Sequence, residues 1–246
     1  MRVGVRFDVM SDVYDAMINW EKRLSNEAAF YRGIFEEAKA KSVIDVACGT
    51  GRHALLFSSW GLDVEGADIS QEMLSACRKH PGAEKVTWSE RSFSEAAPPR
   101  DVVVCAGNSL AMVENVEETG KAIDAMAKSA NRAIVLHVVN MHARPDGPVI
   151  WDKCRRIKLH GVEHLVNKGI HRSGQHGYVD FILTPLEGTS EQVVTRCVKF
   201  LSLDASWLQH RLHDNGFKRI RLFGGYGGSS FDVAKSPDLV IEAFKG

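Results

Sequence analysis

The residues with the clearest chemical role lie in one stretch, Asp45-Val46-Ala47-Cys48-Gly49-Thr50-Gly51. This stretch follows an apolar run and precedes a helical pattern, so it predicts a tight turn between a strand and a helix. Glycine suits such a turn because a ligand must approach the backbone closely and φ can be positive, and the N–H groups that open the next helix face an anionic or polar group. Asp68 ends the next apolar run, at about 20 residues' distance, where an acid accepts hydrogen bonds from ribose hydroxyls. The turn and the acid together predict a cofactor that contains a nucleoside.

The dinucleotide fingerprint is absent, because Gly51 is followed by Arg52-His53-Ala54. The glycine turn instead resembles the first motif of the class I S-adenosylmethionine-dependent methyltransferases, and Asp68-Ile69-Ser70-Gln71-Glu72-Met73-Leu74 resembles their second. The resemblance implies that S-adenosyl-L-methionine is the cofactor, with its amino-acid end against Gly49 and Gly51 and its ribose on Asp68. It further implies cofactor contacts from Asp45, Ala47, Cys48, Ile69 and Ala106.

The adenine site is predicted just after the third strand, at Ser92 and Phe93. Methyltransferases of this class often carry an acid or amide followed by an aromatic or apolar residue here. Serine is a departure from that pattern and a weaker partner for the adenine amino group, so stacking on Phe93 and a backbone N–H are expected to contribute. The alternative for Phe93 is an ordinary core aromatic.

Two further stretches are similar to the glycine and sarcosine N-methyltransferase group: residues 14–23 with Glu27, and Gly107-Asn108-Ser109. The first implies that Arg23 contacts the cofactor carboxylate, and the second places Asn108 beside the reacting methyl. The alternatives are a surface helix for the first and a turn with a helix N-cap for the second. Val139 stands where that group has an arginine for the substrate carboxylate. Because a desolvated carboxylate needs a cationic partner, free glycine is not the expected acceptor.

An amine nitrogen of a small molecule is the expected methyl acceptor, because no strong base stands out and alignment of the reactants is the main requirement. Candidates for catalysis or for orienting the acceptor are Asn108, Tyr178, Tyr226, His142, Tyr14, Trp20 and Asn140. Two alternatives stay open. One is O-methylation of a small hydroxylated metabolite with His137 or His142 as base. The other is a protein that holds the cofactor without transferring its methyl group.

These side chains require strands that end at a common edge. Apolar runs at 43–47, 63–68, 85–89, 101–106 and 133–139 alternate with helical patterns, which predicts a parallel sheet covered on both faces, with ligands at the carboxyl ends of its strands. The resemblance implies an α/β, Rossmann-like sheet of seven mostly parallel strands, completed by 217–223 and an antiparallel 238–244. We expect a helical lid over 1–41, a core of 42–143 with 204–246, and a substrate-capping insert over 144–203 that contains an antiparallel hairpin.

Composition narrows the remaining classes of function. The 246 residues carry no net formal charge, which argues against a phosphate-binding nucleic-acid protein, and no apolar run suits a signal peptide or membrane span. Five scattered cysteines without a C-x-x-C pair indicate a cytoplasmic protein. His160 and His164 share one face if they lie on a helix, yet no acid or cysteine completes a site, so no metal is expected. A homo-oligomer stays open.

Overall fold

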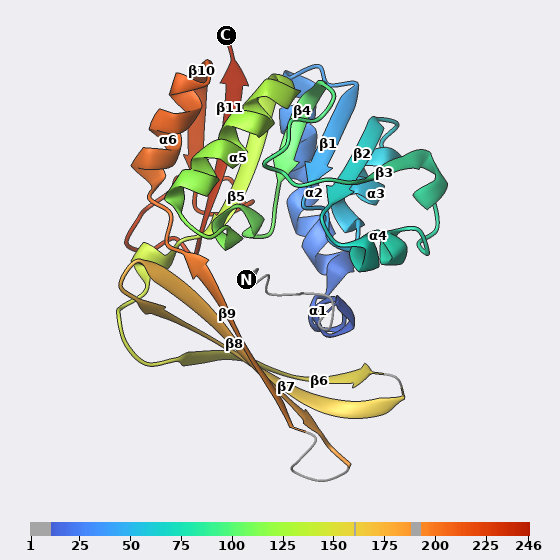
Figure 1. The fold of residues 1–246 in the computed structure, drawn as a ribbon, viewed down its shortest axis with the longest axis vertical. Coiled ribbons are helices and arrows are strands. Elements are labelled where there is room, and N and C mark those ends of the chain that lie inside the picture. Colours follow the sequence, from blue (N-terminus) through green and yellow to red (C-terminus); the bar gives the residue numbers. More distant parts are fainter. Residues whose placement is uncertain (1–10, 160, 188–192) are drawn as a thin grey trace.

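The computed structural model describes residues 11–159, 161–187 and 193–246. Its central sheet consists of β1 (Ser42–Val46), β2 (Asp63–Asp68), β3 (Val86–Glu90), β4 (Arg100–Cys105), β5 (Ala130–Val139), β10 (Phe217–Phe223) and β11 (Asp238–Lys245). The strand order is β10-β11-β5-β4-β1-β2-β3 (Figure 1). Neighbouring strands are parallel except where β11 pairs with β10 and β5. The predicted sheet with its antiparallel last strand is therefore confirmed.

Helices cover both faces of this sheet because its central strands are apolar on both sides. On one face, α2 (Trp20–Glu37) and α3 (Arg52–Ser59) pack on side chains such as Val43 of β1. On the other, α5 (Val116–Ser129) and α6 (Ala205–Asp214) pack on a cluster that includes Ile44, the next residue along the strand. Successive side chains of a strand point to opposite faces, so the continuous apolar run of β1 fills both layers. The remaining short helices are α4 (Gln71–Cys77), η2 (Ala83–Lys85), η3 (Ser109–Met112) and η4 (Met141–Ala143).

The N-terminal segment divides its residues between the core and the edge of the site. After α1 (Ser11–Met17), α2 begins at Trp20, where the side chain of Asn19 caps it by accepting from the N–H of Lys22 at 3.0 Å. The later turns of α2 bury Tyr31 in the core. Only the first turns of this helix reach the strand ends where a ligand is expected.

The segment after η4 forms a second sheet of four antiparallel strands, in the order β6-β7-β8-β9. The strands are β6 (Ile150–Leu159), β7 (Val162–Ser173), β8 (His176–Pro185) and β9 (Val194–Leu201). The sequence predicted only the hairpin of β8 and β9. It missed β6 because nearly all of that strand is exposed and Ile157 alone is buried, which leaves no apolar alternation to detect.

The expected helical spacing of two histidines is wrong, since His164 lies in β7. His160 lies outside the described residues.

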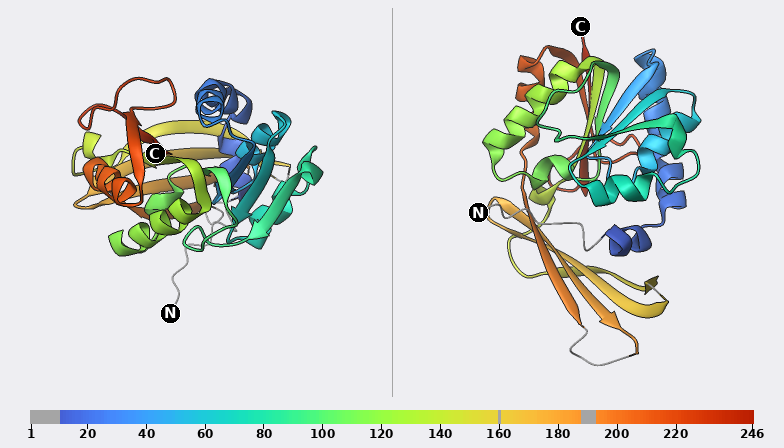
Figure 2. Two further views of the ribbon diagram at one scale, coloured as in Figure 1. Left: turned by 90° about the horizontal axis from the view of Figure 1, so that it is seen from above. Right: turned by 45° about the vertical axis from the view of Figure 1, so that its right-hand side comes forward.

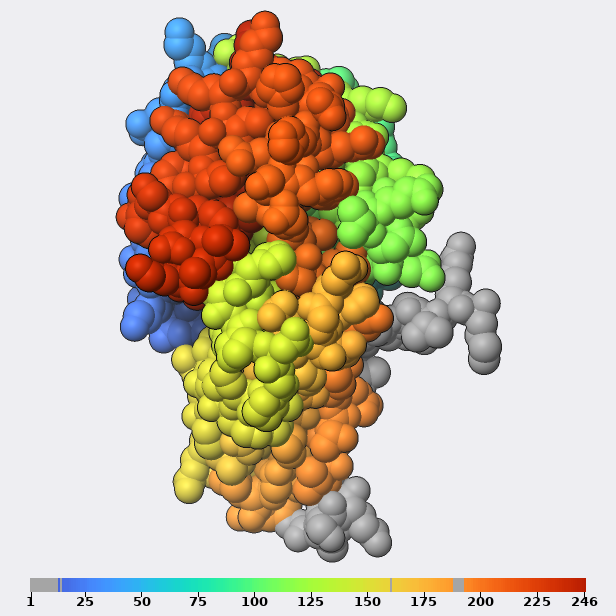
Figure 3. Space-filling view, turned by 90° about the vertical axis from the view of Figure 1, so that its left-hand side faces the viewer, coloured from blue at the N-terminus to red at the C-terminus, as the bar shows by residue number. Residues whose placement is uncertain are grey.

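The second sheet is joined to the core at two places (Figure 2). Phe200 and Ile170 enter the main core cluster beside Met141, which follows β5. At the other side, Met17 of α1 packs on Val166, so α1 lies between the two sheets. The yellow-green segment after β5 covers the outside of this junction (Figure 3). The second sheet consequently faces the carboxyl end of β5, where the site is expected.

No helix in the described part of the chain is both long and apolar enough to cross a membrane.

Candidate functional site

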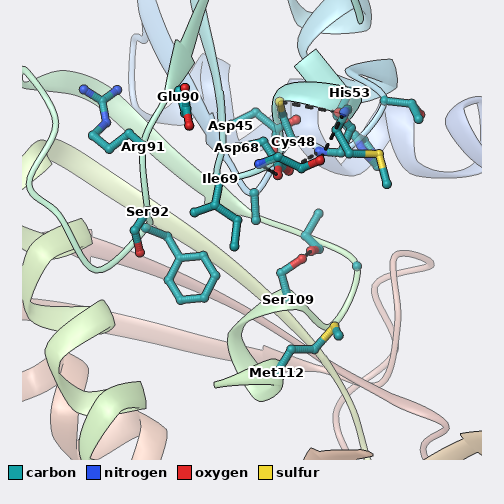
Figure 4. A pocket seen from close by; sticks show the side chains of 18 of the residues that line it. Asp45, Cys48, His53, Asp68, Ile69, Glu90, Arg91, Ser92, Ser109 and Met112 are labelled. Atoms are coloured by element: carbon teal, nitrogen blue, oxygen red, sulfur yellow. Dashed lines mark hydrogen bonds between the residues drawn. The ribbon is translucent and has the colours of Figure 1, made fainter. Parts of the chain in front are cut away.

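A cavity of about 800 Å³ opens at the carboxyl ends of β1 to β4 (Figure 4). Every predicted cofactor residue except Gly51 lines it: Arg23, Asp45, Ala47, Cys48, Gly49, Asp68, Ile69, Ser92, Phe93 and Ala106. The parallel strands bring these residues together because each contributes the residues that follow its carboxyl end.

The glycine turn is held by Asp68. One oxygen of its carboxylate accepts from the N–H of Gly49 at 2.8 Å, and the other accepts from the N–H of Ser70 at 2.9 Å. Gly49 has φ +55°, and a Cβ added to it would meet nothing within 4 Å. Gly51 has φ +78°, and its Cβ would lie 2.6 Å from the ring of Trp88 and 2.8 Å from the sulfur of Cys77. Gly49 therefore borders open space in the cavity, whereas Gly51 permits close packing behind it.

Asp45 lines the cavity with one carboxyl oxygen that has no partner. Its side chain is 2% exposed and its Oδ2 has no hydrogen-bond partner among the described residues. Burial raises the pKa of Asp45 to about 8, and the charge of Asp68 contributes to the same shift, against a hydrogen bond from the backbone of Ala54. A buried polar atom without a partner is costly, so this position suits a ligand that brings a cationic group.

Arg23 lines the cavity and belongs to a largely buried network. Its Nε donates to Glu27 at 2.8 Å, and the second oxygen of Glu27 lies 2.6 Å from Nε2 of His53. Burial raises the pKa of Glu27, whereas His53 and Arg23 lower it. Their combined effect is the larger one, so the pKa of Glu27 lies below its ordinary value. Burial lowers the pKa of His53 despite Glu27, so the neutral ring donates to the carboxylate. The sequence suggested the Arg23–Glu27 spacing, but nothing in it pointed to His53.

Asp15 connects α1 to the glycine turn. Its Oδ1 accepts from Trp20 Nε1 at 2.9 Å and from Thr50 Oγ1 at 2.8 Å, while its Oδ2 accepts from Arg52 at 2.9 Å. Because α1 also packs on β6 and β7, this one carboxylate couples the turn to the second sheet. Trp20, predicted to bind the acceptor, lines the cavity.

The far wall of the cavity contains residues that sequence reasoning missed. Ser109, Met112 and Val113 lie in or just after η3, beyond the end of β4. Lys199 comes from β9 of the second sheet. No local pattern marks them, because only the packing of the second sheet and of η3 brings them to the cavity.

Several predicted catalytic or acceptor-binding residues do not line the cavity. The amide oxygen of Asn108 accepts from the N–H of Val139 at 2.9 Å, and Asn140 donates to the carbonyls of Val233 and Ser236. Tyr178 stacks on His171 at 4.8 Å between ring centroids.

Two other candidates, Tyr226 and His142, also do not line the cavity. Tyr226 shares a hydrogen bond of 2.9 Å with the hydroxyl of Tyr31, and its ring lies 5.3 Å from that of His137. His142 is exposed on η4. The side chain of Tyr14 lies outside the described part of the molecule.

His137 lies behind the strand ends, and a polar group lies near each of its ring nitrogens. Its Nδ1 accepts from the N–H of Gly107 at 3.3 Å, so the proton of the neutral ring is on Nε2. Nε2 lies 3.3 Å from Oδ1 of Asp238. Among the described residues, no group of three or more His, Cys, Asp or Glu side chains is placed to hold a metal ion.

Comparisons with known proteins agree with this geometry. A family model described as a methyltransferase domain matches residues 43–132. The glycine/sarcosine N-methyltransferase of Aphanothece halophytica is 34% identical over 244 residues, covering 94% of this chain and 86% of the relative. The sugar N-methyltransferase KedS8 of a Streptoalloteichus species has a similar structure, with a TM-score of 0.75 at 18% identity, covering 100% of this chain and 95% of that one. CalS10, an amino pentose methyltransferase from Micromonospora echinaspora, gives a TM-score of 0.74 at 18% identity and 99% coverage of both chains.

The chain therefore belongs to the class I S-adenosylmethionine-dependent methyltransferases, and it resembles their glycine/sarcosine N-methyltransferase group. It is an enzyme, and S-adenosyl-L-methionine is its cofactor. The cavity suits this molecule, since the unpartnered Oδ2 of Asp45 and the open side of Gly49 leave room for a cationic, amino-acid-like end.

Proposed function

We propose that the protein methylates the nitrogen of a small amine. When bound, S-adenosyl-L-methionine supplies an electrophilic methyl group on a sulfonium. Arg23, Asp45 and Gly49 would hold its amino-acid end and Asp68 its ribose. Ile69, Ser92 and Phe93 would hold its adenine, because they lie at the exposed end of the same cavity. The protein's contribution is to align acceptor and methyl group in a site that excludes water.

The hydrogen bond that Nδ1 of His137 accepts from Gly107 is the observation that favours an amine over a hydroxyl acceptor. A hydroxyl needs a base to remove its proton, whereas an amine attacks once it is unprotonated. The lone pair of His137 Nδ1 is already used by Gly107, and Nε2 carries the proton. His142, the other candidate base, is exposed and does not line the cavity. Neither histidine is well suited to accept a proton from a hydroxyl at the strand ends.

A matched substrate panel tests this proposal. The purified protein with cofactor is offered small amines and the corresponding alcohols, and formation of S-adenosylhomocysteine is measured against pH. We expect transfer to amines only, with a rate that rises with pH as the amine deprotonates. We also expect the pH profile to keep its shape in His137→Asn and His142→Ala. Transfer to alcohols that disappears in His137→Asn would favour O-methylation, and tight cofactor binding without any transfer would favour a cofactor-holding protein.

The unpaired cysteines, of which Cys48, Cys77 and Cys105 are buried thiols, support a reducing, cytoplasmic location for this activity.

A further inference from the structure

The second sheet places two lysines directly opposite each other. In the antiparallel pairing of β6 with β7, Lys153 stands opposite Lys168, so the two side chains project from the same face. Like charges at directly opposed positions destabilise a sheet. This arrangement therefore weakens the second sheet unless an anion lies near both ammonium groups.

Lys168 projects toward the core. Val166 and Ile170, two positions away on either side, are buried, the first against α1 and the second in the main core cluster. Since side chains alternate along a strand, Lys168 shares their face. Burial lowers the pKa of Lys168, and the positive charges of Lys153 and Arg144 act in the same direction, against those of Asp152 and Asp238.

The three cations have acids nearby, Asp152 and Asp238, but form no ion pair with them. Within the ranges that the structure describes, the side chains of Lys153, Lys168 and Arg144 form no ion pair and no side-chain hydrogen bond. Lys158, also on β6, differs because it stands opposite Glu163. The half-buried Lys168, with Lys153 and Arg144, thus forms a positive surface that faces the core.

This positive surface lies near the end of β5, because Ile170, two positions from Lys168, packs in the core cluster that contains Met141. Gly107 lines the cavity and donates to His137, whose Nε2 lies 3.3 Å from Asp238. Asp238 stands at the start of β11, opposite Val139, and its charge acts on Lys168. Asp238 thus contacts His137, and its charge also acts on Lys168.

We propose that Lys168, with Lys153 and Arg144, binds an anionic group of the methyl acceptor, a carboxylate or a phosphate. This inference rests on the proposed amine methylation and adds that the acceptor carries an anion several bonds from its nitrogen. Lys168, Lys153 and Arg144 do not line the cofactor cavity, so the acceptor that reaches them is longer than free glycine.

Three series of acceptors test the anion site: ω-amino carboxylates of increasing length, aminoalkyl phosphates, and alkylamines of the same lengths. We expect kcat/KM at least about tenfold higher for one anionic series than for the alkylamines, since a charge-assisted contact of about 1.4 kcal/mol gives that factor. Lys168→Met should remove this preference by raising KM for the anionic acceptor, while kcat on alkylamines and KM for the cofactor stay unchanged. Lys158→Met is the matched control and should behave like the parent.

The possible outcomes separate the two proposals. Equal activity on charged and neutral amines, or an unchanged preference in Lys168→Met, overturns the anion site and leaves amine methylation intact. If no amine is methylated, the proposed function fails. Calorimetric binding of an ω-amino carboxylate to the complex with S-adenosylhomocysteine then decides the anion site: binding that Lys168→Met abolishes supports it, and unaffected or absent binding overturns it.

Stability without ligand gives an independent readout. Removing one of two opposed charges should raise the Tm of Lys168→Met by about 2 °C, because relief of the repulsion stabilises the sheet. Inorganic phosphate should raise the Tm of the parent more than that of the variant. A lower Tm in Lys168→Met, with no difference in phosphate response, would mean that the lysine is structural.

Discussion

The two glycines of the cofactor turn should respond differently to the same substitution. Gly51→Ala places a Cβ 2.6 Å from the Trp88 ring and 2.8 Å from the Cys77 sulfur. The left-handed backbone costs an alanine about 1–2 kcal/mol, and overpacking costs about 1–3 kcal/mol more. Gly49→Ala, with φ +55° and nothing within 4 Å, should lose only the backbone contribution. We therefore expect Gly51→Ala to be the less stable variant by the overpacking contribution.

Thermal and denaturant unfolding without cofactor measure this difference. For a chain of this size, the Tm of Gly51→Ala should fall by about 5–15 °C and that of Gly49→Ala by a few degrees. Gly49→Ala should be the more stable variant but should bind the cofactor poorly. Folded at 25 °C, it should bind at least about tenfold more weakly than the parent, because its methyl group projects into the cavity.

A smaller ring at position 88 provides a control. The double variant Gly51→Ala with Trp88→Phe should be less unstable than the sum of the single effects, with a coupling of about 1 kcal/mol. Equal stability of Gly51→Ala and Gly49→Ala, or additive effects with Trp88→Phe, would refute the packing argument. Parent-like cofactor binding by Gly49→Ala would refute its position beside the ligand.

Three further predictions concern buried polar contacts. Tyr226→Phe leaves the hydroxyl of Tyr31 without a partner and should cost about 1–3 kcal/mol in urea unfolding, whereas the double variant with Tyr31→Phe should be less destabilised than the single one. The folded pKa of Asp45, about 8, lies above its unfolded value. Unliganded stability should consequently fall as pH rises from about 4 to about 8, and binding of the cationic cofactor near pH 7 should release a proton, so that affinity rises with pH in the parent but not in Asp45→Asn. Asp15→Ala removes the hydrogen bonds that α1 accepts from Trp20, Thr50 and Arg52, and should speed cofactor release in stopped-flow measurements more than it lowers Tm.

A different result would contradict each of these three predictions. A double tyrosine variant less stable than Tyr226→Phe would mean that the hydroxyl pair is not the source of the loss. Binding heats that do not vary with the ionisation enthalpy of the buffer would show that Asp45 keeps its protonation state. Unchanged release from Asp15→Ala would mean that α1 does not retain the cofactor.

The sequence determined the core sheet and most of the cofactor cavity because both depend on short-range patterns. The apolar run of β1, the glycine turn and Asp68 lie within one strand–turn–helix–strand unit, and the positions of their chemistry follow from the parallel sheet that such units build. The caps of α6 are local in the same way: Asp204 accepts from the N–H of Trp207 at 2.8 Å, and Gly216 follows with φ +86°.

Tertiary structure decided everything that depends on partners distant in the chain. The Tyr31–Tyr226 contact joins residues 195 positions apart, and His53 meets Glu27 across 26 positions. Nearly all of β6 is exposed, which leaves no apolar alternation in that strand. Its pairing with β7, and with it the opposed Lys153 and Lys168, therefore exists only in the folded molecule. A local pattern records the burial of a residue within its own element, but it contains no information about which distant side chain completes a hydrogen bond or a charge cluster.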